Sequence, residues 1–78
     1  IRTCYERQLN RKDDLFGKLV LEWDIGEQGR VTGIRPKSNE LGNREVADCV
    51  MRVLKVAKFP EPPTSQEVTV TYPFFFSN

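Results

Sequence analysis

The chain has 78 residues, of which 38% are hydrophobic and 29% charged, a composition typical of one soluble globular domain. Its net charge of +1 lacks the basic excess that is usual in nucleic-acid-binding domains. No apolar run approaches the roughly 20 residues of a membrane-spanning helix, so we expect neither a membrane span nor a signal peptide here. Because the chain begins at Ile1 rather than Met, we expect residues 1–78 to be one domain of a longer protein.

The first part of the chain predicts a short helix, a loop and a strand. Residues 1–9 are expected to be helical, because their apolar side chains, among them Cys4 and Tyr5, recur on one helical face. Residues 10–14 contain both basic and acidic side chains and are expected to form a solvated loop. Residues 17–25 alternate large apolar side chains with mainly polar ones, which is the pattern of a half-buried strand.

A β-hairpin is expected next. Residues 26–29 have the sequence Gly-Glu-Gln-Gly, and glycine at both ends of a four-residue segment is typical of a tight turn. The return strand, residues 30–37, does not alternate strictly, so we expect a β-bulge near Gly33. Pro36 indicates that this strand lies at an edge of the sheet, since proline cannot donate to a ladder.

Residues 43–58 show the clearest helical periodicity in the chain. Asn43 is the expected N-cap, and Pro60 prevents the helix from continuing. Apolar side chains at intervals of three and four residues form one continuous stripe, which predicts a helix that lies on a flat apolar surface. They are Val46, Cys49, Val50, Val53, Leu54 and Ala57.

A last strand over residues 67–76 is expected after the proline-rich, extended residues 59–65. Its two faces follow from the strand period of two. The side that faces the core is predicted to carry Val68, Val70, Tyr72, Phe74 and Phe76. The other side is predicted to carry Thr69, Thr71, Pro73 and Phe75.

These elements predict a small α+β domain with the order helix-strand-strand-helix-strand. The hairpin places the second strand beside the first, and a right-handed crossover through the long helix lets the last strand pair antiparallel with the first. We therefore expect a three-stranded antiparallel sheet in the order second-first-third. Both helices are expected on one face of it, with Trp23 beneath them on the central strand.

A series of short motifs spans nearly the whole chain. They are Cys4-Tyr5, Gly17-x-Leu19-x-Leu21-x-Trp23-x-Ile25, Gly29-x-Val31, Ser38, Cys49, Phe59-Pro60 and Val68-x-Val70-x-Tyr72-Pro73-Phe74. In this order and spacing the chain resembles the TonB C-terminal domain. It resembles more closely the variant at the ends of myxobacterial gliding-motility proteins, the AgmX/PglI C-terminal type.

The resemblance implies a TonB-like fold and a non-enzymatic protein-interaction domain in the periplasm. The domain would lie at the end of an envelope protein that is anchored in the inner membrane. There it would couple an inner-membrane motor to a protein partner in the periplasm or outer membrane, as part of a gliding-motility or energy-transducing machinery. Nucleic acid, a small-molecule substrate and a cofactor are not expected.

The two cysteines, Cys4 and Cys49, are each predicted on the apolar face of a helix, and both helices are expected on one face of the sheet. A disulfide between them would close a loop of about 46 residues and stabilise the domain by about 4 kcal/mol on the chain-entropy model. The oxidising compartment implied by the resemblance favours this bond. Two free buried cysteines, packed as small hydrophobic side chains, are the alternative.

The last strand is the candidate interaction site, since in the expected order it lies at a sheet edge with unpaired backbone groups. An extended peptide can pair with such an edge by β-augmentation, the mode for which TonB-like domains are known. Phe74 and Phe76 are expected to complete the core, whereas Phe75, on the uncovered face with Val20, is open to either role. The candidate partner-binding residues are Thr69, Thr71, Pro73 and Phe75.

The same edge has an alternative use. A second copy of the chain could pair with it, which would make the domain a structural assembly module that forms homodimers. Sedimentation at high concentration separates the two uses, because only the second predicts a dimer.

Catalytic and metal-binding functions are not expected. The sequence contains no histidine, which excludes a Ser-His hydrolase mechanism. Its two cysteines are far apart and form no C-x-x-C motif, so they predict neither a zinc site nor a redox-catalytic site. The adjacent Asp13 and Asp14 lack further groups that would complete a catalytic or metal site.

Overall fold

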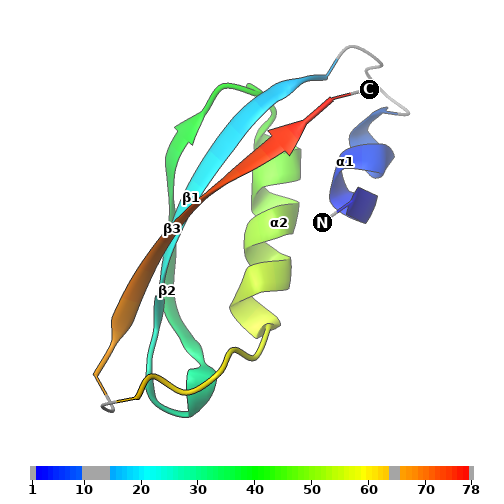
Figure 1. Cartoon of the computed structure of the whole chain (residues 1–78). Coiled ribbons are helices and arrows are strands. Elements are labelled where there is room, and N and C mark those ends of the chain that lie inside the picture. The colour runs from blue at the N-terminus through cyan, green and yellow to red at the C-terminus, as the bar shows by residue number, and fades with distance from the viewer. Residues whose placement is uncertain (1, 10–14, 64–65, 78) are drawn as a thin grey trace.

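A computed structural model describes residues 2–9, 15–63 and 66–77 of the chain (Figure 1). The elements are α1 (Arg2–Leu9), β1 (Gly17–Ile25), the 3-10 turn η1 (Glu27–Gly29), β2 (Val31–Asn39), α2 (Arg44–Val56) and β3 (Val68–Phe76). The predicted α+β class and three-stranded antiparallel sheet are confirmed, and the strands lie in the order β2-β1-β3. The charged loop predicted at residues 10–14, which includes Asp13 and Asp14, lies outside the described residues.

β1 is the central strand, and its alternating sequence produces the core. It pairs antiparallel with β2 on one side and with β3 on the other. Leu19, Leu21, Trp23 and Ile25 are all buried, whereas the residues between them are half-buried on the opposite face. Because the pleat points successive side chains to opposite faces, four apolar residues of one strand lie beneath the helices.

β2 contains two irregularities that alter which of its residues face the core. The register with β1 shifts between Asp24 and Ile25 and again between Val20 and Leu21, which leaves Thr32 and Lys37 as the extra residues. The first bulge adjoins Gly33, where the sequence predicted one. With Thr32 inserted, Val31 and Ile34 both pack against the core although they are three residues apart.

α2 begins where the sequence predicted and presents a slightly different face. The side chain of Asn43 accepts a hydrogen bond from the N–H of Val46 at 2.8 Å, so Asn43 is the N-cap. The buried face consists of Val46, Ala47, Val50 and Leu54. The prediction that Val53 belongs to the covered stripe is wrong, since this side chain is 41% exposed. None of the helices in the described ranges is long and apolar enough to cross a membrane.

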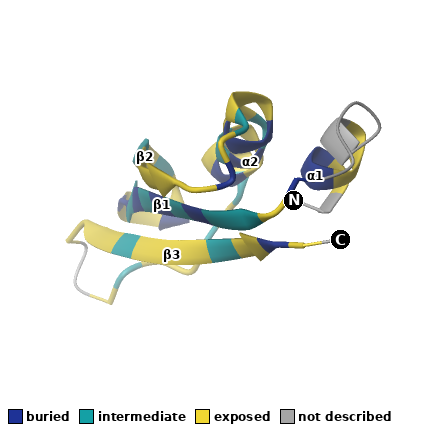
Figure 2. Ribbon diagram, turned by 90° about the horizontal axis from the view of Figure 1, so that it is seen from above, coloured by how far each residue is buried: buried dark blue, intermediate teal, exposed yellow. Residues whose placement is uncertain are grey.

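α2 does not cover the whole sheet. It lies over β1 and β2, while β3 lies to one side of it (Figure 2). A helix about 10 Å across covers roughly two strands spaced about 4.8 Å apart, so the third strand of the sheet is left uncovered. For this reason Val68 and Tyr72 are 42% and 53% exposed, although both lie on the helix side of the sheet, as predicted.

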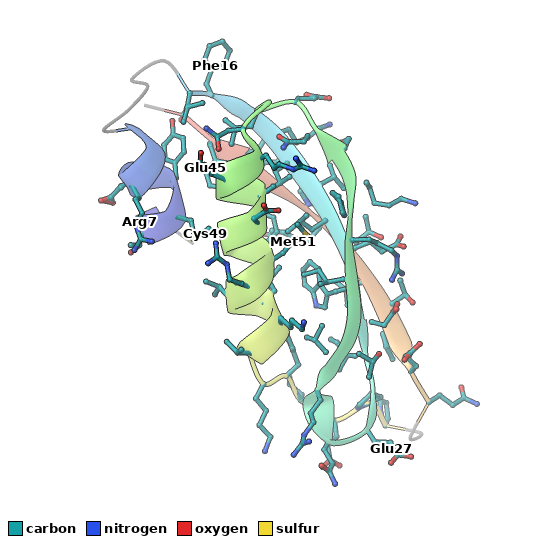
Figure 3. The ribbon with its side chains drawn as sticks, turned by 180° about the vertical axis from the view of Figure 1, so that it is seen from behind. Arg7, Phe16, Glu27, Glu45, Cys49 and Met51 are labelled. Carbon is teal, nitrogen blue, oxygen red and sulfur yellow. A yellow bond between two sulfur atoms is a disulfide. The ribbon has the colours of Figure 1, made fainter. Side chains whose placement is uncertain are left out.

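α1 is attached to the rest of the fold by its cysteine and its tyrosine. Cys4 forms a disulfide with Cys49 of α2, with a Cα–Cα distance of 5.6 Å, and the side of α2 that carries Cys49 faces α1 (Figure 3). The Tyr5 hydroxyl donates a hydrogen bond to the carbonyl of Leu15. The Tyr5 ring also packs on Phe76 at a centroid distance of 5.0 Å. α1 therefore covers the end of the core where β1 begins and β3 ends.

The chain after α2 returns to the hairpin. The N–H of Phe59 donates to the carbonyl of Gly29 at 2.9 Å, and Lys58 forms an antiparallel bridge with Arg30. The Phe59 ring lies against Trp23 at 6.1 Å. Gly29 has a φ of 73°, and a Cβ atom added there would overlap the carbonyl oxygen of Phe59. The glycine thus permits both the turn and the close approach of the returning chain.

Replacement of both cysteines by alanine is expected to lower the melting temperature by more than about 10 °C, since a loop this long contributes about 4 kcal/mol. Differential scanning calorimetry with and without a dithiol reductant measures the effect. The reductant should destabilise the wild-type protein and leave the double variant unchanged. An equal effect of reductant on both proteins would show that the disulfide does not stabilise the fold.

Gly29→Ala and Gly42→Ala form a matched pair, because both glycines have a φ near 70° and no atom lies near the Cβ position of Gly42. Gly42→Ala should cost about 1–2 kcal/mol from backbone conformation alone. Gly29→Ala should cost at least about 2 kcal/mol more, because it displaces the Phe59 hydrogen bond and the Trp23 contact. Urea denaturation measures both, and equal losses would contradict the steric role of Gly29.

Candidate functional site

The edge of the sheet formed by β3 is the candidate site. β3 pairs with β1 from Val68, opposite Ile25, to Phe76, opposite Gly17. On its other side, no strand among the residues that the structure describes pairs with it. Backbone groups on that side are therefore available to an extended chain.

The direction of the β3 backbone groups follows from the pairing of β1. In an antiparallel ladder the N–H and C=O of one residue point to the same side, and the side alternates along the strand. The carbonyl of Lys18 accepts a hydrogen bond from the N–H of Glu40, next to the end of β2, at 2.8 Å. The even-numbered residues of β1, Val20 included, therefore point toward β2.

Pro73 lies opposite Val20, whose backbone groups point toward β2, so Val20 and Pro73 form a pair without mutual hydrogen bonds. The backbone groups of Pro73 and of the other odd-numbered residues of β3 therefore point away from β1. The outward N–H groups belong to Thr69, Thr71 and Phe75, and Pro73 interrupts the row because it has no N–H. These are the four partner-binding residues predicted from the sequence, and the structure brings them together along one edge.

The side chains of the two threonines take part in contacts within the sheet. The Thr69 hydroxyl donates to Oδ1 of Asp24 at 2.8 Å, and the Thr71 hydroxyl donates to Oε2 of Glu22 at 3.0 Å. Both residues remain exposed. A partner at this edge would thus meet threonine side chains that β1 already holds in place.

The two carboxylates are held in turn by Arg35 of β2. Its guanidinium donates to Oε1 of Glu22 at 2.8 Å and to both carboxylate oxygens of Asp24 at 2.9 and 3.0 Å. Hydrogen bonds from Arg35 and Thr69 lower the pKa of Asp24 to about 2, and those from Arg35 and Thr71 lower the pKa of Glu22. The same contacts raise the pKa of Arg35 above its ordinary value. We call this set of five residues the strand-tie network.

On the sheet face opposite the helices, an apolar patch lies where β1 begins and β3 ends. Phe75 is 75% exposed and lies opposite Lys18, while Pro73 lies opposite the half-buried Val20. Phe16, which precedes β1, is also exposed and projects away from the ribbon (Figure 3). Val20, Pro73 and Phe75 are neighbours in the register, so this patch is contiguous rather than scattered.

The helix-side surface of β3 is a part of the site that sequence reasoning missed. Tyr72 packs edge-on against Phe74 at a centroid distance of 5.0 Å, and Phe74 packs against Trp23 at 6.4 Å. The prediction that Phe74 and Phe76 complete the core is consistent with their packing, whereas Tyr72 is half exposed beside them. Alternation along the strand gives the face of Tyr72, but it does not tell which strands the helix covers.

Among the described residues, no group of three or more histidine, cysteine and acidic side chains is arranged to hold a metal ion. The comparisons with known proteins returned no matching family model, no matching curated protein and no matching solved structure. The chemistry of the site therefore has to be argued from the residues of the β3 edge.

The strand-tie network predicts a loss of stability in acid. Because folding lowers the pKa of Asp24 below its unfolded value near 4, the unfolded chain binds more protons in this range, and stability falls from about pH 4 to about pH 2. Thermal unfolding between pH 2 and 7 measures this fall. Asp24→Asn should be less stable at neutral pH and should show a shallower acid slope.

Asp48→Asn is the matched control, since it removes an exposed carboxylate of α2 that has no contact with Arg35. Its acid slope should match that of the wild-type protein. If Asp24→Asn keeps the full slope as well, the network does not determine the acid response.

Proposed function

We propose that this chain is a non-enzymatic protein-interaction domain that captures an extended segment of a partner by β-strand addition at β3. The outward N–H groups of Thr69, Thr71 and Phe75 are the observation that carries this proposal. Main-chain hydrogen bonds to such a row provide affinity without requiring a particular partner sequence. The interruption at Pro73 divides the row and limits how far any one strand can pair.

The side chains beside the row define what the captured segment should look like. On the helix side it would meet the exposed parts of Val68 and Tyr72, and on the other side Thr71 and Phe75. An added strand alternates its side chains between these two faces. The partner segment is therefore an extended stretch with apolar residues at every second position, facing Val68 and Tyr72.

The cellular setting is proposed from the resemblance to the TonB C-terminal domain and its gliding-motility variant. In that setting the domain lies in the periplasm, at the end of a protein anchored in the inner membrane, and transmits force or conformational change to a partner. The Cys4–Cys49 disulfide is compatible with an oxidising compartment.

A homodimer through the same edge is the second candidate. The row from Thr69 to Thr71 can pair antiparallel with its own copy, which would place the exposed Tyr72 of each copy beside the exposed Val68 of the other. Sedimentation velocity over a wide concentration range tests it. A concentration-dependent dimer that Thr71→Pro abolishes would favour the homodimer over partner capture.

Thr71→Pro tests the edge directly, because it removes an outward N–H without changing a buried side chain. Peptides selected from a random phage-displayed library on the wild-type domain should bind Thr71→Pro up to about tenfold more weakly, since the hydrogen bond donated by the Thr71 N–H, worth up to about 1.5 kcal/mol, is lost. Isothermal titration calorimetry measures the affinity.

Thr71→Val is the matched control for this substitution. It also removes the hydroxyl that donates to Glu22 but keeps the backbone N–H, so it should bind the selected peptides nearly as well as the wild-type domain does. Normal binding by Thr71→Pro, or equal losses in both variants, would refute capture through the backbone of β3.

A further inference from the structure

A second surface lies at the opposite edge of the sheet, where the C-terminal end of α2 lies beside the start of β2 (Figure 3). A groove of about 320 Å³ is lined there by Arg30, Val31, Lys55, Val56, Ala57 and Lys58. A second hollow of about 220 Å³, lined by Lys55 and residues 31–34, continues it along β2. We call the two together the basic groove.

The charged residues of the basic groove are all cationic. Lys58 and Arg30 are direct partners in an antiparallel bridge, and like charges placed opposite each other in this way destabilise a pair of strands. Lys55 lies three residues before Lys58 and lines the same groove. Three positive charges thus surround one hollow.

Nothing in the described part of the chain neutralises these charges through an ion pair. Arg35 and Lys37 form salt bridges with Glu22 and Asp24, and these bridges include no residue of the basic groove. The negative end of the α2 dipole favours Lys55, but its effect is confined to the last turn of the helix. The nearby Glu27 and Glu61 line a separate hollow.

Apolar side chains also line the groove. Val31 and Ala57 are half-buried in it, and Val56 is 83% exposed at its rim. Ile34 lines the continuation along β2. Apolar side chains next to ammonium and guanidinium groups fit a chain that alternates apolar and acidic residues.

We propose that the basic groove binds an extended acidic peptide segment of a protein partner. Its carboxylates pair with Arg30, Lys55 and Lys58, and its apolar side chains contact Val31 and Val56. Charge complementarity selects an acidic chain, and the hollow continues from Arg30 along β2 to Ile34, which suits an extended segment. Because β2 and β3 are opposite edges of the sheet, this site and the β3 edge can be occupied together.

The test uses a fluorescein-labelled synthetic peptide of alternating aspartate and valine, and an asparagine–valine peptide as its neutral counterpart. Fluorescence anisotropy at low ionic strength should show binding of the acidic peptide alone, and added salt should weaken it. The combined substitutions Arg30→Glu, Lys55→Glu and Lys58→Glu should weaken binding about tenfold or more.

The charge-matched control carries Arg7→Glu, Arg44→Glu and Arg52→Glu, which change the net charge equally at exposed positions that do not line the groove. It should retain affinity within about twofold of the wild-type domain. Amide chemical shifts should change at residues 30–34 and 55–58. The basic groove and the β3 edge share no residue, so the Thr71→Pro variant should bind the acidic peptide with the same affinity as the wild-type domain.

Three results would overturn the proposal. Equal weakening in the groove variant and its control would show attraction by net charge alone. Shift changes confined to residues 68–76 would assign the peptide to β3. Co-sedimentation with phosphatidylserine vesicles that depends on Arg30, Lys55 and Lys58, without binding of the acidic peptide, would assign the groove to a membrane surface.

Discussion

The width of one helix is the constraint on which this structure depends. α2 is the sole long helix in the described ranges, and it covers β1 and β2, so β3 is attached to the domain mainly through its ladder with β1. The same limitation leaves Val68 and Tyr72 exposed on the helix side, next to an edge of β3 with which no strand in the described residues pairs. A second long helix on the same face would bury these two side chains.

No layer formed by the described residues covers the face of the sheet opposite the helices, and polar contacts between strands stabilise that face instead. Arg35 joins β2 to β1 through Glu22 and Asp24, and the two carboxylates join β1 to β3 through Thr69 and Thr71. Each carboxylate accepts hydrogen bonds from both neighbouring strands, which fixes the register from β2 to β3. The arrangement keeps β3 in place while its outer edge remains free.

Local sequence patterns determined much of this fold, and long-range register determined the rest. The alternation of residues 17–25, the Asn43 cap and the cysteine-bearing helical faces each follow from spacing within one element, and each was predicted. The contacts of Arg35 depend on bulges at Thr32 and Lys37 that composition does not specify. The meeting of Arg30 and Lys58 depends on the chain returning to the hairpin after α2. Val53 was misassigned to the covered stripe, and Tyr72 lies on its predicted face but is half exposed, because periodicity gives the face of a side chain but not the reach of the layer above it.

The disulfide also determines how the domain bears mechanical load. Residues 5–48 lie inside the covalent loop closed by Cys4 and Cys49, so tension applied between the start of α1 and the end of β3 cannot extend them. The load passes from Cys4 through the sulfur atoms to α2 and then along the backbone to β3. β1 and β2 are thereby shielded from stretching. The strand that offers its edge to a partner is the strand on the load path, so tension on the chain acts first on the element that would hold the partner.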